Sequence, residues 1–331
     1  MNEQLLAFFE ERKHEYVSGE LLSHYFQCSR TAVWKHIQHL KKKGYVFESV
    51  PRLGYKLVAK PEKIDAAKIM RELQTKSFGR NLILIEQTGS TQTLAQQQAA
   101  AGAEEGTLVI AEKQTAGRGR MGRKWHSPPG KGVYMSLILR PDIPLAFAPQ
   151  LTALVSVALC RAIRNMCGIE IGIKWPNDLL FNGKKICGIL LESRAEDEKL
   201  LVVIAGIGIS VNLEEADFPD DIRNRATSLF IASGAKVDRE KLIANFLREL
   251  EELYAIFRSD GFHSIRILWE ALSVTLHNRV EVKTGRGIVA GIAEAIDPLG
   301  GLVVRKSDGK KTTVYSGEVG FTEAAAKRAQ E

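Results

Sequence analysis

The segment of residues 114–122, QTAGRGRMG, restricts the possible folds of this chain more than any other stretch. Three glycines alternate here with Arg118 and Arg120, and Arg123 follows directly. Glycine disfavours both helix and strand, so the segment is expected to be a mobile loop. Guanidinium groups and glycine backbone amides bind anions well, and we therefore expect this loop to become ordered around an anionic ligand.

The loop does not fit the common nucleotide-binding folds. Gly117, Gly119 and Gly122 have the spacing GxGxxG, but a Rossmann site requires a helix directly after the glycines. The residues that follow, WHSPPGKG, contain two prolines and two glycines, which exclude that helix. The P-loop pattern GxxxxGK[ST] does not occur in the sequence. Any nucleotide must therefore be held in another way.

Short apolar runs on both sides of this loop predict a mixed sheet with helices. The expected strands are residues 82–86, 107–112, 133–139, 169–175 and 201–212. An amphipathic helix is expected over 150–166, closed by Gly168. Another begins at Ser90 or Thr91, either of which can cap it. A helix N-terminus beside a sheet is a natural site for a carboxylate or phosphate, although plain capping is the simpler interpretation.

Polar residues gather where the motif KWPNDLLFNGKKICGILLES, residues 174–193, turns back on itself. Asn182-Gly183 is a strong hairpin signal. The hairpin brings four polar residues to one end of the sheet: Lys174, Asn177, Asp178 and Lys185. Lysines there could offset the charge that develops during phosphoryl transfer, and a carboxylate could bind magnesium or orient an amine. The alternative is an ordinary surface turn.

The strand at 201–212 contains Gly206 and Gly208, which leave one of its faces without side chains. Such glycines are expected where a ligand lies against the backbone. A β-bulge is the alternative explanation.

The first sixty residues are typical of a winged helix-turn-helix. Helices are expected over 2–13, after Ser18, and over 30–43 after Ser29, with Val33, Ile37 and Leu40 as the buried stripe of the third. The β-prone runs 45–50 and 55–58 form a hairpin with Arg52 near its tip. The residues expected to reach DNA lie at the start and on the outer face of the third helix and on the wing: Ser29, Arg30, Thr31, Lys35, His36, His39 and Arg52.

Charge supports this interpretation. Residues 1–60 contain ten Lys or Arg and six Glu, so +4 of the net charge of +7 lies in this short part of the chain. A basic surface favours nucleic acid as a partner. A solvated basic helix in a three-helix bundle is the alternative.

The remaining segments complete a three-domain organisation. Residues 59–65, AKPEKID, are polar and predict a linker. A helix capped by Asp238 and ended by Gly261 is expected to be packing only, and residues 276–321 predict five short strands. We expect domains at 1–62, 63–272 and 273–321, with a frayed tail at 322–331.

Neither a signal peptide nor an apolar run of 18 residues is apparent. Cys28, Cys160, Cys167 and Cys187 have no zinc-site spacing and are expected to be reduced structural residues. These features predict a cytoplasmic protein without a membrane partner or a protein-bound metal.

Taken together, five motifs resemble those of bacterial biotin protein ligases. They are Ser90-Thr91, GRGRMGR at 117–123 with Trp125, KWPNDL at 174–179, KICGIL at 185–190 and GIGISVN at 206–212. The basic N-terminal domain is similar to that of the bifunctional subclass that also represses biotin operons. The resemblance implies an α+β multidomain fold: a winged helix-turn-helix, a central mixed-sheet α/β ligase domain and a C-terminal SH3-like β-barrel.

The resemblance also implies a two-step reaction. The biotin carboxylate attacks the α-phosphate of ATP, which enters with Mg²⁺, to give biotinyl-5′-AMP and pyrophosphate. The ε-amine of a lysine on a biotin carboxyl carrier domain, such as that of acetyl-CoA carboxylase, then displaces AMP. The adenylate would promote homodimerisation and binding to operator DNA.

Roles in these steps are implied for the matching residues. Lys185, Arg118, Arg120 and Asp178 are expected to serve catalysis. The residues expected to bind biotin or ATP are Ser90, Thr91, Gln114, Gly117, Arg118, Gly119, Arg120, Arg123, Trp125, Lys174, Lys185, Gly188, Gly206 and Gly208.

Two positions depart from the family pattern. Ser210 replaces a usual Asn, and Ala226 stands where some members have a tryptophan against the adenine, so Trp125 becomes the candidate stacking partner. Two other functions remain open: a lipoate or octanoate ligase, against which the GRGR loop and the winged helix argue, and a ligand-sensing transcription factor without catalysis. The phosphate-neutralising Lys185, Asp178 and the arginine loop argue against the second.

Overall fold

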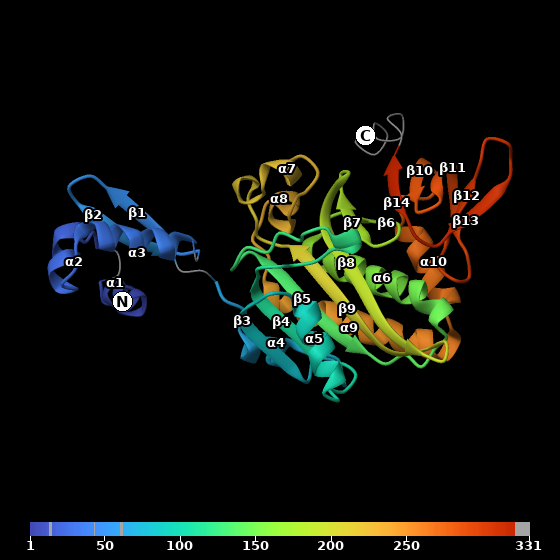
Figure 1. Ribbon diagram of the computed structural model, residues 1–331, viewed down its shortest axis with the longest axis horizontal. Coiled ribbons are helices and arrows are strands. Elements are labelled where there is room, and N and C mark those ends of the chain that lie inside the picture. Colours follow the sequence, from blue (N-terminus) through green and yellow to red (C-terminus); the bar gives the residue numbers. More distant parts are fainter. Residues whose placement is uncertain (13–14, 43, 60–61, 322–331) are drawn as a thin grey trace. The chain divides into compact units, whose positions relative to one another are not determined.

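The computed structural model of the chain describes residues 1–12, 15–42, 44–59 and 62–321 (Figure 1). These residues form two compact units, Met1–Lys63 and Ile64–Glu331. The expected tail at 322–331 lies outside the described residues, as do residues 60 and 61 of the expected linker. Each unit is described by itself.

The first unit is a winged helix-turn-helix, as predicted. It contains α1 (Asn2–Glu11), α2 (Gly19–Tyr25) and α3 (Arg30–Lys42), followed by the antiparallel hairpin of β1 (Val46–Val50) and β2 (Gly54–Ala59). The Ser18 hydroxyl caps α2 by accepting from the Leu21 amide, and the Ser29 hydroxyl accepts from the Ala32 amide at the start of α3. Val33, Ile37 and Leu40 are buried against α1, which confirms the predicted stripe.

The second unit is built on a seven-stranded mixed sheet with the order β3-β4-β5-β9-β8-β7-β6. The strands are β3 (Leu82–Thr88), β4 (Leu108–Gln114), β5 (Gly132–Leu139), β6 (Gly172–Lys174), β7 (Asp178–Phe181), β8 (Lys184–Glu196) and β9 (Lys199–Ser210). Only β3 and β4 are parallel neighbours. The strand expected over 169–175 is shorter than predicted: only Gly172–Lys174 form a strand, and residues 168–171 are irregular.

Helices cover the two faces of this sheet unequally. Helix α5 (Thr91–Ala100) packs on one face through Ala95, against Val109, Ile138 and Ile204. The other face is covered by α6 (Ala148–Cys167), α9 (Arg239–Asp260) and α10 (His263–Leu272), with α4 (Ala66–Glu72) against α9 (Figure 1). Asp238 caps α9 through the Lys241 amide and Gly261 ends it, as predicted. The short helices α7 (Asp220–Arg223) and α8 (Leu229–Ser233) follow β9.

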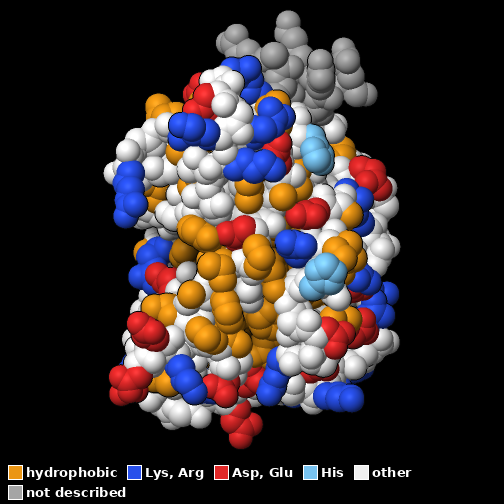
Figure 2. All heavy atoms as spheres, turned by 90° about the vertical axis from the view of Figure 1, so that its right-hand side faces the viewer, with side chains coloured by type: hydrophobic (Ala, Val, Ile, Leu, Met, Phe, Trp, Pro, Cys, Tyr) orange, Lys and Arg blue, Asp and Glu red, His pale blue; other side chains and the backbone are white. Residues whose placement is uncertain are grey.

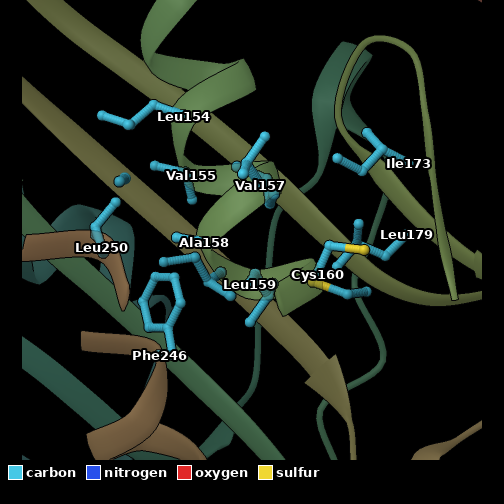
Figure 3. Close-up of a cluster of buried hydrophobic side chains, with 14 of the residues drawn as sticks. Leu154, Val155, Val157, Ala158, Leu159, Cys160, Ile173, Leu179, Phe246 and Leu250 are labelled. Carbon is cyan, nitrogen blue, oxygen red and sulfur yellow. The ribbon is translucent and has the colours of Figure 1, made fainter. Parts of the chain in front are cut away.

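Helix α6 is the centre of the core. Its Leu154, Val155, Ala158 and Leu159 are fully buried, and Figure 3 shows them between Phe246 and Leu250 of α9 on one side and the sheet on the other. The stretch Leu145–Cys167 is long and apolar enough to cross a membrane, so the expectation that no such run exists was wrong. Most of it is buried inside this unit, which accounts for its apolar sequence.

The predicted linker is shorter than expected. Ile64 is buried and donates its amide to the Glu112 carboxylate, and Asp65 caps α4 through the Ala67 amide. These two residues therefore belong to the second unit.

The C-terminal strands form a five-stranded antiparallel sheet with the order β13-β12-β11-β10-β14, as expected for the SH3-like domain. They are β10 (Arg279–Thr284), β11 (Gly287–Ile296), β12 (Leu302–Arg305), β13 (Lys311–Val314) and β14 (Glu318–Phe321). The residue before β14 approaches the loop between β4 and β5, since the Arg120 guanidinium lies 3.4 Å from the Gly317 carbonyl oxygen.

Candidate active site and nucleic-acid interface

A cavity of about 330 Å³ lies on the α5 face of the central sheet. Its walls are the start of α5, the arginine loop, the β7–β8 hairpin, β9, and residues from the C-terminal domain. All predicted catalytic and ligand-binding residues line it except Gly117. At Gly117 a Cβ would lie 2.8 Å from the Trp125 carbonyl oxygen and 3.0 Å from Gln114 Nε2, so this glycine allows the loop to close on itself.

One end of the cavity is a buried network of neutral polar groups. The Gln114 Oε1 atom accepts from the Thr91 amide at 2.9 Å and lies 3.2 Å from the Thr91 hydroxyl, while Gln114 Nε2 donates to Ser127 at 3.1 Å. Ser136 Oγ lies 2.9 Å from Thr91 Oγ1 and 3.0 Å from Gln92 Oε1. Because these groups are neutral donors and acceptors, this end suits an uncharged polar headgroup.

Ser90 and Thr91 were expected to cap α5. Ser90 is the N-cap residue, but neither its hydroxyl nor that of Thr91 makes a capping bond there. The Thr91 amide is satisfied instead by Gln114 from β4. The two hydroxyls therefore line the cavity rather than end the helix.

The cavity wall is also rich in cationic side chains. Seven Lys or Arg side chains line the cavity, against two carboxylates, Asp178 and Glu318: Arg118, Arg120, Arg123, Lys124, Lys174, Lys185 and Arg225. Lys185 Nζ lies 2.7 Å from Asp178 Oδ1 and 5.3 Å from the centre of the Trp125 ring. Burial lowers the pKa of both Lys174 and Arg120. Such an excess of partly buried positive charge favours a polyanionic ligand.

The β7–β8 hairpin brings these groups together as predicted. Asn182 and Gly183 both have positive φ, 47° and 76°, which is the geometry of a type I′ turn. Lys174 pairs in register with Asp178, and Asp178 with Gly188. The two lysines and the carboxylate are therefore fixed by the sheet.

The arginine loop is folded onto the sheet, with a 3₁₀ turn at Arg120–Gly122. Each of its arginines has an anionic or polar partner. Arg118 lies 3.3 Å from Glu192 on β8, Arg120 donates to Asn177 at 3.2 Å, and Arg123 pairs with Glu318 of β14. The Arg123 guanidinium lowers the pKa of the Glu318 carboxyl. The loop thus joins the central sheet to the C-terminal domain.

The glycines of β8 and β9 accommodate protein side chains. A Cβ at Gly208 would lie 2.4 Å from Trp125 Nε1, and one at Gly188 would lie 3.0 Å from the same indole. A Cβ at Gly206 would lie 2.4 Å from Gln92 Oε1. Trp125 and Gln92 therefore lie over these glycines, and together with the glycines they line the cavity, so a ligand against this backbone stays a prediction.

Sequence reasoning missed Gln92, Ser136, Glu192 and Ser127. Ser136 could have been predicted as a site residue, since it is the only aliphatic hydroxyl in the otherwise apolar run VYMSLIL. Of the two departures from the family pattern, both Ser210 and Ala226 line the cavity. Ala226 lies beside Lys185, whose amide donates to the Arg225 carbonyl at 2.8 Å.

On the first unit, the predicted DNA-binding residues fall into two groups. Ser29, Thr31, Lys35 and His39 are exposed along α3, and Arg52 is exposed at the tip of the wing with φ 69°. Arg30 is exposed but lies 2.6 Å from Glu20. His36 was wrongly placed on the outer face: it is half-buried and its Nδ1 lies 2.6 Å from Asn2 Oδ1 of α1. Trp34, which is half exposed, was not predicted as part of this surface.

Comparison with known proteins agrees with this geometry. Three family profiles match the chain: the HTH domain at residues 2–56, the Biotin/lipoate A/B protein ligase family at 84–210 and the Biotin protein ligase C terminal domain at 275–321. The chain is 45% identical over 319 residues to the bifunctional ligase/repressor BirA of Bacillus subtilis (strain 168), covering 96% of this chain and 98% of that protein.

More distant relatives extend the comparison. The bifunctional ligase/repressor BirA of Escherichia coli (strain K12) is 29% identical over 317 residues, which is 94% of each chain. The solved biotin protein ligase from Aquifex aeolicus in complex with biotin and ATP is 31% identical, with a TM-score of 0.63, and it matches 73% of this chain and 99% of its own. The winged helix-turn-helix, the mixed sheet with its cavity, and nearly full-length similarity show that the chain belongs to the bifunctional ligase/repressor family of biotin protein ligases.

Proposed function

We propose that this protein joins biotin and ATP into biotinyl-5′-AMP, transfers the biotinyl group to a lysine of biotin carboxyl carrier domains, and represses biotin genes with the adenylate as corepressor. One observation carries the catalytic part: a neutral polar network and a cationic cluster line the same cavity. An uncharged headgroup fits the neutral network and a triphosphate fits the cationic cluster, so the carboxylate of an acid and the α-phosphate can meet in this cavity.

In the first step, a carboxylate oxygen of biotin forms a bond to the α-phosphorus of ATP, and the bond from that phosphorus to the bridging oxygen breaks, releasing pyrophosphate. Two anions must approach each other. Lys185 offsets this repulsion and the charge on the phosphoryl oxygens, while Arg120 and Arg123 contact the phosphates. Asp178 holds the Lys185 ammonium group at 2.7 Å and so directs it into the cavity.

In the second step, the neutral ε-amine of the acceptor lysine attacks the carbonyl carbon of the mixed anhydride. The bond to the phosphate oxygen breaks, AMP leaves, and the amide nitrogen loses a proton. Arg118 and the folded loop keep the adenylate from water until the acceptor arrives.

Mg²⁺ is proposed to enter with the nucleotide. Within the described part of the chain, no group of three or more His, Cys, Asp or Glu residues is arranged to hold a metal. Mg²⁺ commonly binds substrate phosphates through its own waters and one or two carboxylates, so Asp178 is the candidate protein ligand.

Trp125 is the proposed partner of the adenine ring. Its indole lies against Gly188 and Gly208, and its Nε1 is buried without a hydrogen-bond acceptor in the described structure. An aromatic face in the cavity supports stacking, and the indole N–H can donate to the ligand.

We propose domains at 1–62, 63–272 and 273–321; the division between the two units after Lys63 and the C-terminal profile that begins at 275 lie within two residues of these bounds and support them. Homodimerisation is part of the proposal. A mostly apolar groove beside the site, lined by Pro149, Pro176, Leu191, Val203 and Tyr315, supports an interface, and Figure 2 shows hydrophobic side chains gathered on that face.

All four cysteines are free thiols, which supports the proposed location in the cytoplasm, where thiols are kept reduced.

Transfer to an acceptor tests the proposed function. Full-length protein, ATP, Mg²⁺ and a biotin carboxyl carrier domain are incubated with biotin, lipoate or octanoate, and the carrier is weighed by mass spectrometry. The proposal expects the mass of one biotinyl group on the carrier, and no addition to a carrier whose target lysine is replaced by arginine. Addition of lipoyl or octanoyl groups instead would assign the chain to the lipoate ligases.

The Arg118–Glu192 pair is predicted to retain the adenylate. Glu192→Gln removes the charge and keeps an amide for Gln96, which donates to Glu192 at 3.0 Å. The pair is partly exposed, so the loss of labelled adenylate from the protein is expected to be about 1.5- to 5-fold faster. Glu196→Gln, exposed further along the same strand, is the control and should release adenylate at the unaltered rate. Equal release by both variants would remove this role from Glu192.

Lys35 is predicted to contact a DNA phosphate. Lys35→Ala should weaken operator binding at every salt concentration and reduce the slope of log affinity against log salt by about 1. Fluorescence anisotropy over a salt series, with adenylate present, measures this. Lys241→Ala removes an exposed lysine from α9 and should leave the slope unchanged. An unchanged slope for Lys35→Ala would exclude the proposed contact.

A further inference from the structure

Gln92 fills the space above Gly206 and is held in one orientation. Its side chain is 3% exposed, and its Nε2 donates to the Ile204 carbonyl at 2.9 Å and to the Leu190 carbonyl at 3.2 Å. Rotating the amide by 180° would place its oxygen against two carbonyl oxygens. The Oε1 atom therefore faces Ser136, towards which it can only accept a hydrogen bond.

Ser136 is the donor to that oxygen. It is completely buried on β5, in register with Gly206, and its Oγ lies 3.0 Å from Gln92 Oε1. A hydroxyl has one proton, and the neighbouring Thr91 hydroxyl, 2.9 Å away, can donate as well as accept. A buried acceptor left without a donor is unfavourable, so the Ser136 proton belongs to Gln92.

The same reasoning determines the direction of the Thr91 hydroxyl. Gln114 is also fixed, since its Oε1 accepts from the Thr91 backbone amide at 2.9 Å. The Thr91 proton can therefore be donated within the protein, to Ser136 Oγ at 2.9 Å or to Gln114 Oε1 at 3.2 Å. When the Thr91 proton is donated in either of these directions, Thr91 Oγ1 presents a lone pair to the cavity.

We infer that Gln92 and Ser136 are positioning residues that lock the Thr91 hydroxyl as a hydrogen-bond acceptor and thereby select an acid whose headgroup carries an N–H. This inference rests on the proposed function and deepens it. The ureido ring of biotin has two N–H groups, whereas the dithiolane of lipoate and the chain of octanoate have none. Gly206 is part of the arrangement, because a side chain there would displace the Gln92 amide.

The test compares ligands that differ by one N–H. Binding of biotin and of its two cyclic carbamate analogues, each with one ureido nitrogen replaced by oxygen, is measured by calorimetry on full-length protein. For the unaltered protein, one of the analogues is expected to bind at least about 10-fold more weakly than biotin, because its ring oxygen faces the Thr91 lone pair.

Ser136→Ala is expected to reduce this ratio at least threefold, because Thr91 then loses the nearer of its two internal acceptors and can turn its proton to the ring oxygen. Biotin should bind more weakly, and the carbamate should bind as well as before or better. A purely structural effect of the substitution would weaken both ligands equally and leave the ratio unchanged, which would overturn the inference. Should Ser136→Ala fail to fold, Gln92→Met, which removes the acceptor, is judged by the same ratio.

A matched control is available on α6. Ser156 is equally buried and donates only to the Thr152 carbonyl, so Ser156→Ala should leave the ratio at the unaltered value. The inference and the proposed function fail separately. If the unaltered protein does not bind biotin, the proposed function is wrong, whereas biotin binding with no discrimination between N–H and oxygen refutes only the inference.

Discussion

Replacing Lys185 by alanine is expected to slow adenylate formation by roughly 10²- to 10³-fold, the usual effect of removing one preorganised group that stabilises charge in a transition state. Lys185 is half-buried, lies 2.7 Å from Asp178, and is held over the Trp125 ring. Its ammonium group is therefore already directed into the cavity before the nucleotide binds. Single-turnover formation of labelled adenylate at saturating biotin and ATP measures the rate of this step.

Lys184 provides the matched control for Lys185. It is the neighbouring residue on the same hairpin, carries the same charge, and is exposed. Lys184→Ala should form adenylate within about twofold of the unaltered rate, since exposed charges outside the site have small effects. If the two substitutions slowed adenylate formation equally, the proposed catalytic role of Lys185 would be excluded.

Replacing Glu112 by alanine is expected to destabilise the second unit by about 3–5 kcal/mol, the usual cost of removing one member of a buried ion pair. Glu112 and Arg239 are both nearly inaccessible, and their side chains lie 3.1 Å apart. The carboxylate also accepts from the Ile64 amide and, at 3.3 Å, from the Gly130 amide. One side chain thus joins the start of this unit, β4, the end of the arginine loop and α9.

Urea unfolding of the full chain, followed by tryptophan fluorescence, measures the effect of Glu112→Ala. The comparison is Glu170→Ala, which removes an ion pair to Arg164 from a carboxylate that is 83% exposed. That change should cost under about 1 kcal/mol. Equal destabilisation by the two substitutions would show that the buried Glu112–Arg239 pair contributes no more to the free energy of unfolding than an exposed ion pair.

Much of the fold was predictable because its signals are local. Ser18, Ser29 and Asp238 cap helices through amides three residues away, and Asn182-Gly183 forms the turn that its sequence favours. The charged part of the site followed from the same hairpin, since pairing of β7 with β8 brings Asp178 close to Lys185.

The rest depends on contacts between distant residues. Gln92 lies over Gly206, more than a hundred positions away in the sequence. The sequence therefore shows that this position is a glycine, but not which side chain covers it. His36 lies on a helix whose outer face is basic, yet its ring is turned towards Asn2 of α1. The amphipathic pattern of α6 predicted one buried face, yet every residue from Ala153 to Cys160 is buried, because α9, α10 and the sheet cover the helix on several sides.

The most direct test of the ligase assignment is the conversion of [α-³²P]ATP by the purified full-length protein with biotin, lipoate, octanoate or no acid. We predict labelled acyl-adenylate with biotin alone, and impaired formation or retention in the Lys185→Ala and Arg118→Ala variants. Binding of biotin without adenylate formation from any acid would contradict the account and leave a ligand-sensing transcription factor in its place.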